Sequence, residues 1–375
     1  MSTLQELISY CNEENTSGAL LLTGEMGCGK TFLIEKELSE ALSETHFIIR
    51  VSLLGVDSLK ALDEAVRKQW LFVCTPYLAK VDQRKKQIKK NSGLFSAISS
   101  ALSAVNPLAG NFANAVASFD PMEYIPLEPE VEDFHDNGKM KKVVVVFDDL
   151  ERNKLDLMEI MGFINGYCEN KKFKTIIIAN EQVILAKCIK DSSGNGLAAY
   201  KMIKEKTVAR TVLYIPDFQE IIHSINTSGK WPSEEYERFL IENEELIRDV
   251  FSSDSLQQRD GLNKRHNFRS LICALRDFYP VYELLKEKNI PGKEKYLSSF
   301  ITYMMIWRNG IFREGQTSFD VTLEDVLELY PDYSPEAIPG SVRRWVEYGI
   351  WDEDKITEEL SLSSQSLRFG RDVSS

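Results

Sequence analysis

The stretch GALLLTGEMGCGKTFLIEKEL, residues 18–38, joins three sequence patterns. Four apolar residues and a threonine follow Gly18, as is typical of a buried strand. A glycine-rich segment, GEMGCGKT, comes next, and apolar residues at helical spacing come after it. The stretch therefore predicts a strand, a tight loop, and a helix that begins where the loop ends.

The glycine-rich segment fits the phosphate-loop pattern GxxxxGK[ST]. In that pattern the backbone N–H groups of the loop and the helix N-terminus face phosphate oxygens. Lys30 would reach the β- and γ-phosphates, and the Thr31 hydroxyl would bind Mg²⁺. A glycine-rich turn without a ligand is the alternative. The residues expected around the nucleotide are Gly24, Glu25, Met26, Gly27, Cys28, Gly29, Lys30, Thr31 and Phe32.

A second motif, KKVVVVFDDLER at residues 141–152, has the form of a Walker B strand. A continuous β-branched run ends in two carboxylates, and Asp148 would hold Mg²⁺ directly or through water. Asp149 stands where many such ATPases have a glutamate that polarises the attacking water. Because an aspartate is one methylene shorter, Glu151 stays open as the alternative catalytic base.

The tetrapeptide NKLD, residues 153–156, matches the guanine-reading NKxD motif of GTPases. It lies beside the phosphate site at a helix start, whereas in GTPases the motif ends a later strand. We interpret Asn153 or Asp156 as a helix cap instead. Because DDLE also lacks the DxxG pattern, ATP is preferred over GTP.

Three further polar residues are candidates for catalysis. Asn180 ends the strand IIIAN and could position the lytic water, although an asparagine that stabilises the next turn is the alternative. Arg210 and Arg269 are candidates for stabilising charge in the transition state. Either arginine could also be a solvated or paired surface residue. If Arg210 or Arg152 acts across a subunit boundary, hydrolysis requires an oligomer.

Strand-like apolar runs alternate with helical patterns over residues 1–217, which predicts a parallel-sheet α/β P-loop NTPase core of about five strands. The expected strands are 19–22, 46–53, 143–147, 175–180 and 211–216. An insertion at 76–138 interrupts the core between the two motifs. Asp57 is placed as the cap of a helix over 57–70. After Pro216 amphipathic patterns predict a helical lid or effector domain over 218–375.

The composition limits the classes of protein that fit. The formal net charge is -12, which is unsuited to a general nucleic-acid binder. The six cysteines form no CxxC, and no Cys/His metal spacing occurs, so we expect no structural metal. Without a disulfide framework or secretory signal, the reducing cytoplasm is the expected compartment.

The insertion carries a basic run at 80–90 and an uncharged stretch at 91–119. The uncharged stretch is long enough to span a membrane, but serines, asparagines and Pro107 dilute it, so a span is not expected. A helical hairpin packed on a partner or on the core is preferred. Weak peripheral contact of 80–119 with anionic lipid at the inner membrane, and a solvated helix with a loop, are the alternatives.

The motifs together resemble one family. LLLTGEMGCGKT, RVSLLGVDSLKALDEAV, the block from VVVVFDDLER to IIIANE, KEKTVARTVLYIPD and NFRSLICAL are similar to the bacterial KAP-type P-loop ATPases. That group resembles a branch of the additional-strand ATPases, related to the AAA and STAND classes. The similarity covers most of residues 1–285. It implies the roles given above for the motif residues, and it places Arg269 at the family's second sensor arginine in the helical lid.

The resemblance further implies an ATP-driven switch, in a family often linked to membranes or phage exclusion. We therefore predict a Mg²⁺-dependent ATPase in bacterial anti-phage defence or signalling, with a protein partner or a homo-oligomer. An ATP-binding regulatory module with little turnover is the first alternative. A P-loop kinase is the second, although the sequence has no arginine cluster suited to a kinase lid.

Overall fold

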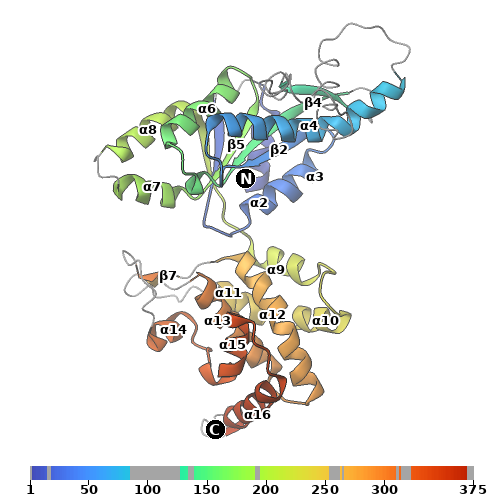
Figure 1. Cartoon of the computed structure of the whole chain (residues 1–375), viewed down its shortest axis with the longest axis vertical. Helices are drawn as coiled ribbons and strands as arrows, with labels where there is room; N and C mark the ends of the chain where they lie inside the picture. The colour runs from blue at the N-terminus through green and yellow to red at the C-terminus, as the bar shows by residue number, and fades with distance from the viewer. Residues whose placement is uncertain are drawn as a thin grey trace, which may run out of the picture. The chain divides into compact units, whose positions relative to one another are not determined.

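The computed structural model describes residues 2–14, 18–84, 127–133, 139–190, 195–252, 262–263, 266–309, 312–313 and 322–369. The chain forms two compact units. The first comprises Met1–Gly24 and Lys30–Ile215, and the second comprises Glu25–Gly29 and Pro216–Ser375. Figure 1 shows a sheet with helices in the first unit and a mainly helical second unit. The predicted boundary between 217 and 218 stays a prediction.

A parallel sheet forms the centre of the first unit and confirms the predicted α/β class. Its strands lie in the order β2-β4-β5-β1-β6, and each neighbouring pair is parallel. Because all crossovers carry helices, both faces of the sheet are covered, which explains the continuous apolar runs. The strands are β1 (Ala19–Thr23), β2 (His46–Ser52), β4 (Lys139–Asp148), β5 (Lys174–Ala179) and β6 (Val208–Leu213).

A sixth strand, β3 (Glu130–Asp133), joins the five parallel strands. It runs antiparallel to the start of β4, with Val131 opposite Lys141. From sequence, the segment PMEYIPLEPEVEDFHD at 121–136 predicts an exposed connector, because it is acidic and contains prolines. Charge complementarity explains the difference, since the Lys141 ammonium lies 2.6 Å from the Asp133 carboxylate.

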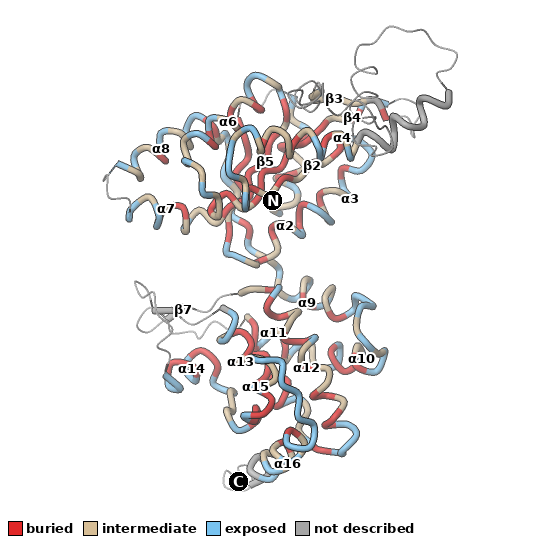
Figure 2. The backbone as a smooth tube through the Cα atoms, viewed as in Figure 1, coloured by how far each residue is buried: buried red, intermediate tan, exposed pale blue. Residues whose placement is uncertain are grey.

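Helices α4 (Leu59–Arg84), α6 (Leu157–Glu169), α7 (Glu181–Lys190) and α8 (Gly196–Thr207) cover one face of the sheet. Alternate strand residues such as Leu21, Val145 and Ile177 are buried against these helices. Helix α1 (Thr3–Asn12) packs on the opposite face of the sheet. There the Tyr10 hydroxyl donates to the carbonyls of Gly18 and Thr175. Figure 2 shows the buried strands between partly exposed helices.

The helix after the phosphate loop contains a π-helical stretch. It consists of α2 (Lys30–Phe32), the π-helical residues Leu33–Leu38 and α3 (Ser39–Ala41). Leu33, Ile34 and Leu38 are buried, as the apolar spacing predicts. This helix connects the loop to β2 and thereby fixes the loop against the sheet.

Two helix caps decide between sequence interpretations. Ser58 caps α4, because its Oγ accepts the N–H of Ala61, so the prediction of Asp57 as the cap is wrong. Asp156 caps α6 by accepting the N–H groups of Met158 and Glu159. Serine and aspartate are both strong N-cap residues, and the position at which each helix begins decides which residue caps it.

Most of the predicted insertion lies outside the described residues. Helix α4 continues into it as far as Arg84, and β3 lies near its end. The uncharged stretch 91–119, with its predicted hairpin and lipid contact, is outside the described part. Among the described residues, no helix is both long and apolar enough for a membrane span.

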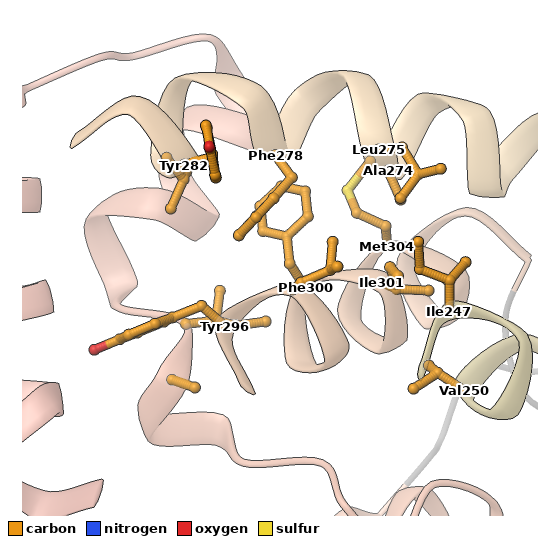
Figure 3. Close-up of a cluster of buried hydrophobic side chains, with 14 of the residues drawn as sticks. Ile247, Val250, Ala274, Leu275, Phe278, Tyr282, Tyr296, Phe300, Ile301 and Met304 are labelled. Carbon is orange, nitrogen blue, oxygen red and sulfur yellow. The ribbon is translucent and has the colours of Figure 1, made fainter. Parts of the chain in front are cut away.

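The second unit is mainly helical, with a short two-stranded sheet that the sequence did not indicate. Figure 3 shows its core, where Phe278 and Leu275 of α12 face Phe300 and Met304 of α13. The elements are α9 (Phe218–Asn226), α10 (Glu234–Glu242), α11 (Glu244–Ser252), β7 (Leu262–Asn263), α12 (Phe268–Glu287), α13 (Lys293–Asn309), β8 (Phe312–Arg313), α14 (Leu323–Leu329), α15 (Gly340–Tyr348) and α16 (Glu353–Phe369).

Truncation of Phe278 tests this core. Its ring is fully buried and lies 5.5 Å from the ring of Phe300 between centroids. Phe278→Ala is expected to lower the free energy of unfolding by about 3–5 kcal/mol, because transfer and cavity costs add. Urea unfolding followed by circular dichroism measures this. Tyr348→Ala, at a 71% exposed site in the same unit, should change it by less than about 0.5 kcal/mol. Equal effects would contradict the described core.

Candidate nucleotide site

The phosphate loop leaves the carboxyl end of β1 and enters α2. Gly27 and Gly29 have φ values of 78° and 102°, a region that glycine adopts without strain. Lys30 begins α2 and is 8% exposed. Its Nζ donates to the carbonyl of Gly24 at 2.7 Å, so the ammonium is directed back toward the start of the loop.

The loop tip, Glu25–Gly29, belongs to the second compact unit. There the Phe268 N–H donates to the Gly27 carbonyl at 3.0 Å. A Cβ on Gly27 would lie 2.2 Å from Oδ1 of Asn267, the N-cap of α12, so a larger residue would have to displace this capping side chain. Arg269 is exposed in the same first turn, and its backbone N–H donates to Asn267 Oδ1. The predicted lid arginine therefore follows directly after the residues that contact the loop tip.

Asp148 ends β4 and connects it to the loop helix. The Thr31 hydroxyl donates to Asp148 Oδ2 at 2.9 Å, although the two residues are 117 positions apart in the sequence. The Asp148 side chain is 5% exposed, and its Oδ1 accepts the Asp149 N–H at 2.8 Å. The two residues predicted to bind Mg²⁺ are thus in direct contact.

Asp149 has a left-handed backbone conformation, with φ 62° and ψ 35°. This conformation is uncommon for residues other than glycine, asparagine and aspartate, and it often accompanies function. The Ser52 hydroxyl donates to Asp149 Oδ2 at 2.9 Å, and Arg152 Nε lies 3.7 Å from Oδ1. The side chain is 28% exposed, so solvent reaches this carboxylate.

Glu151 and Asn180 connect the ends of β4 and β5. Glu151 is 9% exposed, and its Oε2 accepts the backbone N–H of Asn180 at 3.1 Å. The backbone carbonyl of Glu151 accepts from Lys187. Asn180 Oδ1 accepts the Val183 N–H at 3.4 Å in the first turn of α7. In this structure the Glu151 side chain links the end of β4 to the end of β5. The Asn180 side chain stabilises the first turn of α7.

The sheet order places these groups at one edge. In a parallel sheet, ligands bind at the carboxyl ends of the strands. Thr31 follows the β1 loop, Asp148 and Asp149 end β4, and Asn180 follows β5, which lies between β4 and β1. A strand that is distant in the sequence thereby brings its carboxylates to the phosphate loop.

A family model matches the part of the chain that contains this site. The KAP family P-loop domain matches residues 1–279. The chain belongs to the KAP family. Membership places it among the P-loop NTPases, a class built to bind and hydrolyse nucleotides.

Two solved structures are similar to this KAP chain, each at 12% identity. The Drosophila ORC structure bound to GC-rich DNA and Cdc6 aligns over 98% of this chain and 48% of the other, with a TM-score of 0.32. The KAP chain thus spans about half of that chain's length. A DNA polymerase III gamma-subunit-related protein from Thermotoga maritima aligns over 97% and 99%, with a TM-score of 0.29. No curated protein matches the chain.

Arg210 lies apart from the other candidates of the KAP core. It pairs with Glu6 of α1 at 3.2 Å and with Glu13, the C-cap of that helix, at 2.9 Å. Its backbone position is opposite Leu20, near the start of β1, whereas the phosphate loop follows the other end. The structure therefore does not bring Arg210 to the site. Its two ion pairs match the alternative of a paired surface arginine.

Arg50 of the KAP core is a site residue that the sequence interpretation missed. Its Nη1 donates to Asp148 Oδ2 at 3.0 Å, and its Nε donates to Glu35 at 2.6 Å. The signal was present in HFIIRVSL, because a charged residue inside a strand covered on both faces needs a partner. The sequence could not show that this partner is the Walker B carboxylate.

The residues present fit a magnesium ion. Thr31 and Asp148 offer hard oxygen ligands, which Mg²⁺ prefers over nitrogen or sulfur. Within the described ranges, no group of three or more His, Cys, Asp and Glu side chains could hold a metal. Mg²⁺ does not need such a cage, because it commonly uses one or two protein oxygens together with substrate phosphates.

Proposed function

We propose that this chain is a Mg²⁺-dependent ATPase that acts as a molecular switch. The observation that carries the proposal is the 2.9 Å hydrogen bond between Thr31 and Asp148. It joins the phosphate-loop helix to the end of β4, as a shared magnesium site requires. Lys30 directly precedes Thr31 in the sequence and is buried. Its positive charge would bind the phosphates.

Each residue then has a distinct task. Bound Mg²⁺ would neutralise phosphate charge, and Thr31 and Asp148 would hold it. Lys30 would exchange its bond with the Gly24 carbonyl for the β- and γ-phosphates. Asp149 would orient the attacking water and accept its proton, because its carboxylate is partly exposed and steadied by Ser52. Glu151 is less suited as a base, since Asn180 engages its buried carboxylate.

ATP remains the proposed nucleotide because the residues of NKLD have structural tasks. Asn153 donates to the Leu53 carbonyl and accepts the Leu155 N–H, and Asp156 caps α6. Neither side chain is arranged to read a guanine base in this structure. Asp156→Asn is expected to leave nucleotide preference and turnover unchanged, because asparagine caps as well as aspartate.

Direct measurement of phosphate release tests the proposal. The purified chain in Mg²⁺–ATP without any acceptor should release phosphate, and calorimetry should show tighter binding of ATP than of GTP. Release without an acceptor separates hydrolysis from the kinase alternative. If ATP binds and no phosphate appears, the regulatory-module alternative gains support. If neither ATP nor GTP binds, the nucleotide-switch proposal is wrong.

The output of the switch is proposed to pass through the second unit. Arg269 lies in the α12 turn whose Phe268 N–H binds the loop tip at Gly27. A phosphate in the loop would offer Arg269 a charged partner and so bias one conformation over another. The proposed recipient is a protein partner or a second copy. The proposed setting, bacterial anti-phage defence in the cytoplasm, rests on the family resemblance. Isolation of the nucleotide-bound complex from the native host tests the proposed recipient and the proposed setting.

A further inference from the structure

Arg50 occupies an unusual position in the middle of a covered strand. Its neighbours Ile49 and Val51 are buried in the core on the α4 and α6 face. Because side chains alternate along a strand, Arg50 is on the opposite face, where its bond to Glu35 places it beside the loop helix. The side chain is 32% exposed, so solvent reaches the guanidinium.

The contacts of Arg50 converge on one oxygen of Asp148. Oδ2 accepts from Arg50 Nη1 at 3.0 Å and from the Thr31 hydroxyl at 2.9 Å. Oδ1 is engaged by the Asp149 N–H. The guanidinium charge of Arg50 is therefore in direct contact with Asp148 Oδ2. The same oxygen contacts Thr31, the other predicted ligand of Mg²⁺.

We propose that Arg50 is a positioning residue that competes with Mg²⁺ for Asp148 and thereby sets the metal requirement of the site. This inference rests on the proposed function, because it needs Asp148 to be a metal ligand. Two cations attracted to one carboxylate repel each other, so the guanidinium lowers the affinity for a dication. Glu35, at 2.6 Å from Arg50 Nε, provides a second carboxylate that retains the guanidinium when the metal binds.

The proposal has a consequence for when the site is loaded. A bare metal ion must displace or share the Arg50 contact without help. A metal that arrives with a nucleotide brings phosphate charges that offset the repulsion. Arg50 would thus favour loading by the metal–nucleotide complex over loading by the free ion.

Neutralisation of Arg50 tests this idea through metal affinity. Arg50→Met keeps an unbranched, flexible side chain, although a shorter one, and removes the charge. Mn²⁺ would be titrated as the probe, alone and with ADP, and the free ion followed by electron paramagnetic resonance. The variant should bind Mn²⁺ about tenfold more tightly than the wild type, because a neighbouring positive charge is gone. The gain should be larger for Mn²⁺ alone than with ADP.

Three further variants make the result specific. Arg50→Lys keeps the charge but loses the planar fork that reaches both carboxylates, so its Mn²⁺ affinity should lie between those of the wild type and Arg50→Met. Arg248→Met is the matched control, because Arg248 is also 32% exposed and pairs with two acidic residues, and it should leave Mn²⁺ affinity unchanged. Asp148→Asn added to Arg50→Met should remove the gain, which assigns the metal to Asp148. Circular dichroism checks that each variant is folded, and Arg50→Gln replaces Arg50→Met if that variant is not.

The outcomes separate this inference from the function on which it rests. A weaker or unchanged Mn²⁺ affinity in Arg50→Met overturns it and leaves Arg50 as a structural ion pair. A gain that survives Asp148→Asn also overturns it. Absence of ADP binding in the wild type instead contradicts the proposed function, and the titration with Mn²⁺ alone still reports whether Arg50 excludes a cation.

Discussion

Lys30→Met is expected to reduce ATP turnover by at least about 100-fold, because it removes a positive charge placed for the phosphates in the transition state. The lysine is 8% exposed, and its ammonium is directed to the Gly24 carbonyl at the start of the loop. Methionine keeps an unbranched side chain of nearly the same length and removes the charge. A coupled phosphate-release assay at saturating Mg²⁺–ATP measures the turnover.

A second buried lysine provides a matched control for Lys30. Lys141 is also 8% exposed, and its Nζ donates to a backbone carbonyl, that of Ser43. Lys141→Met should lower stability, since Asp133 loses its partner at 2.6 Å, but turnover per folded molecule should stay within about twofold. Equal loss of turnover in both variants would show that the effect of Lys30→Met is structural.

Asp149→Asn should lower turnover by about 100-fold while ATP affinity stays within a few-fold of the wild type. The amide keeps the shape and can still bond to Ser52, but it cannot accept a proton from water. The carboxylate is 28% exposed at the end of β4 and is thus accessible to a water molecule. Single-turnover phosphate release and calorimetric ATP binding separate the two effects.

Glu151→Gln is the comparison that decides between the two candidate bases. Its carboxylate accepts the Asn180 N–H, and the carbonyl oxygen of glutamine can accept the same bond. We expect a change of no more than about fivefold in turnover, from a small shift between β4 and β5. A larger loss in Glu151→Gln than in Asp149→Asn would assign the base to Glu151.

Local pattern was sufficient for the elements that build the site. GEMGCGKT predicted the loop and the helix start, because glycines and a lysine at that spacing have few other uses. VVVVFDD predicted a covered strand that ends in carboxylates, and the structure has β4 ending at Asp148. These signals are contained within about ten residues, so no tertiary information is needed to recognise them.

Pairings across the chain were not accessible in the same way. The bond of Arg50 to Asp148 spans 98 residues, and the bond of Ser52 to Asp149 spans 97. The acidic strand β3 has no alternation of its own and depends on the lysines of β4. Arg210 was a candidate for a catalytic arginine, yet Glu6 of α1 and Glu13, the C-cap of α1, engage it.

The sequence by itself determined the fold class, the phosphate loop and the Walker B strand, because each follows from local chemistry and periodicity. The tertiary structure decided which donors reach which carboxylates: Thr31 and Arg50 bind Asp148, Ser52 binds Asp149, and the Asn180 N–H binds Glu151. Sheet order brings these residues to one edge, and sheet order arises from the packing of helices on both faces. That packing is a property of the whole first unit, and no single segment contains it.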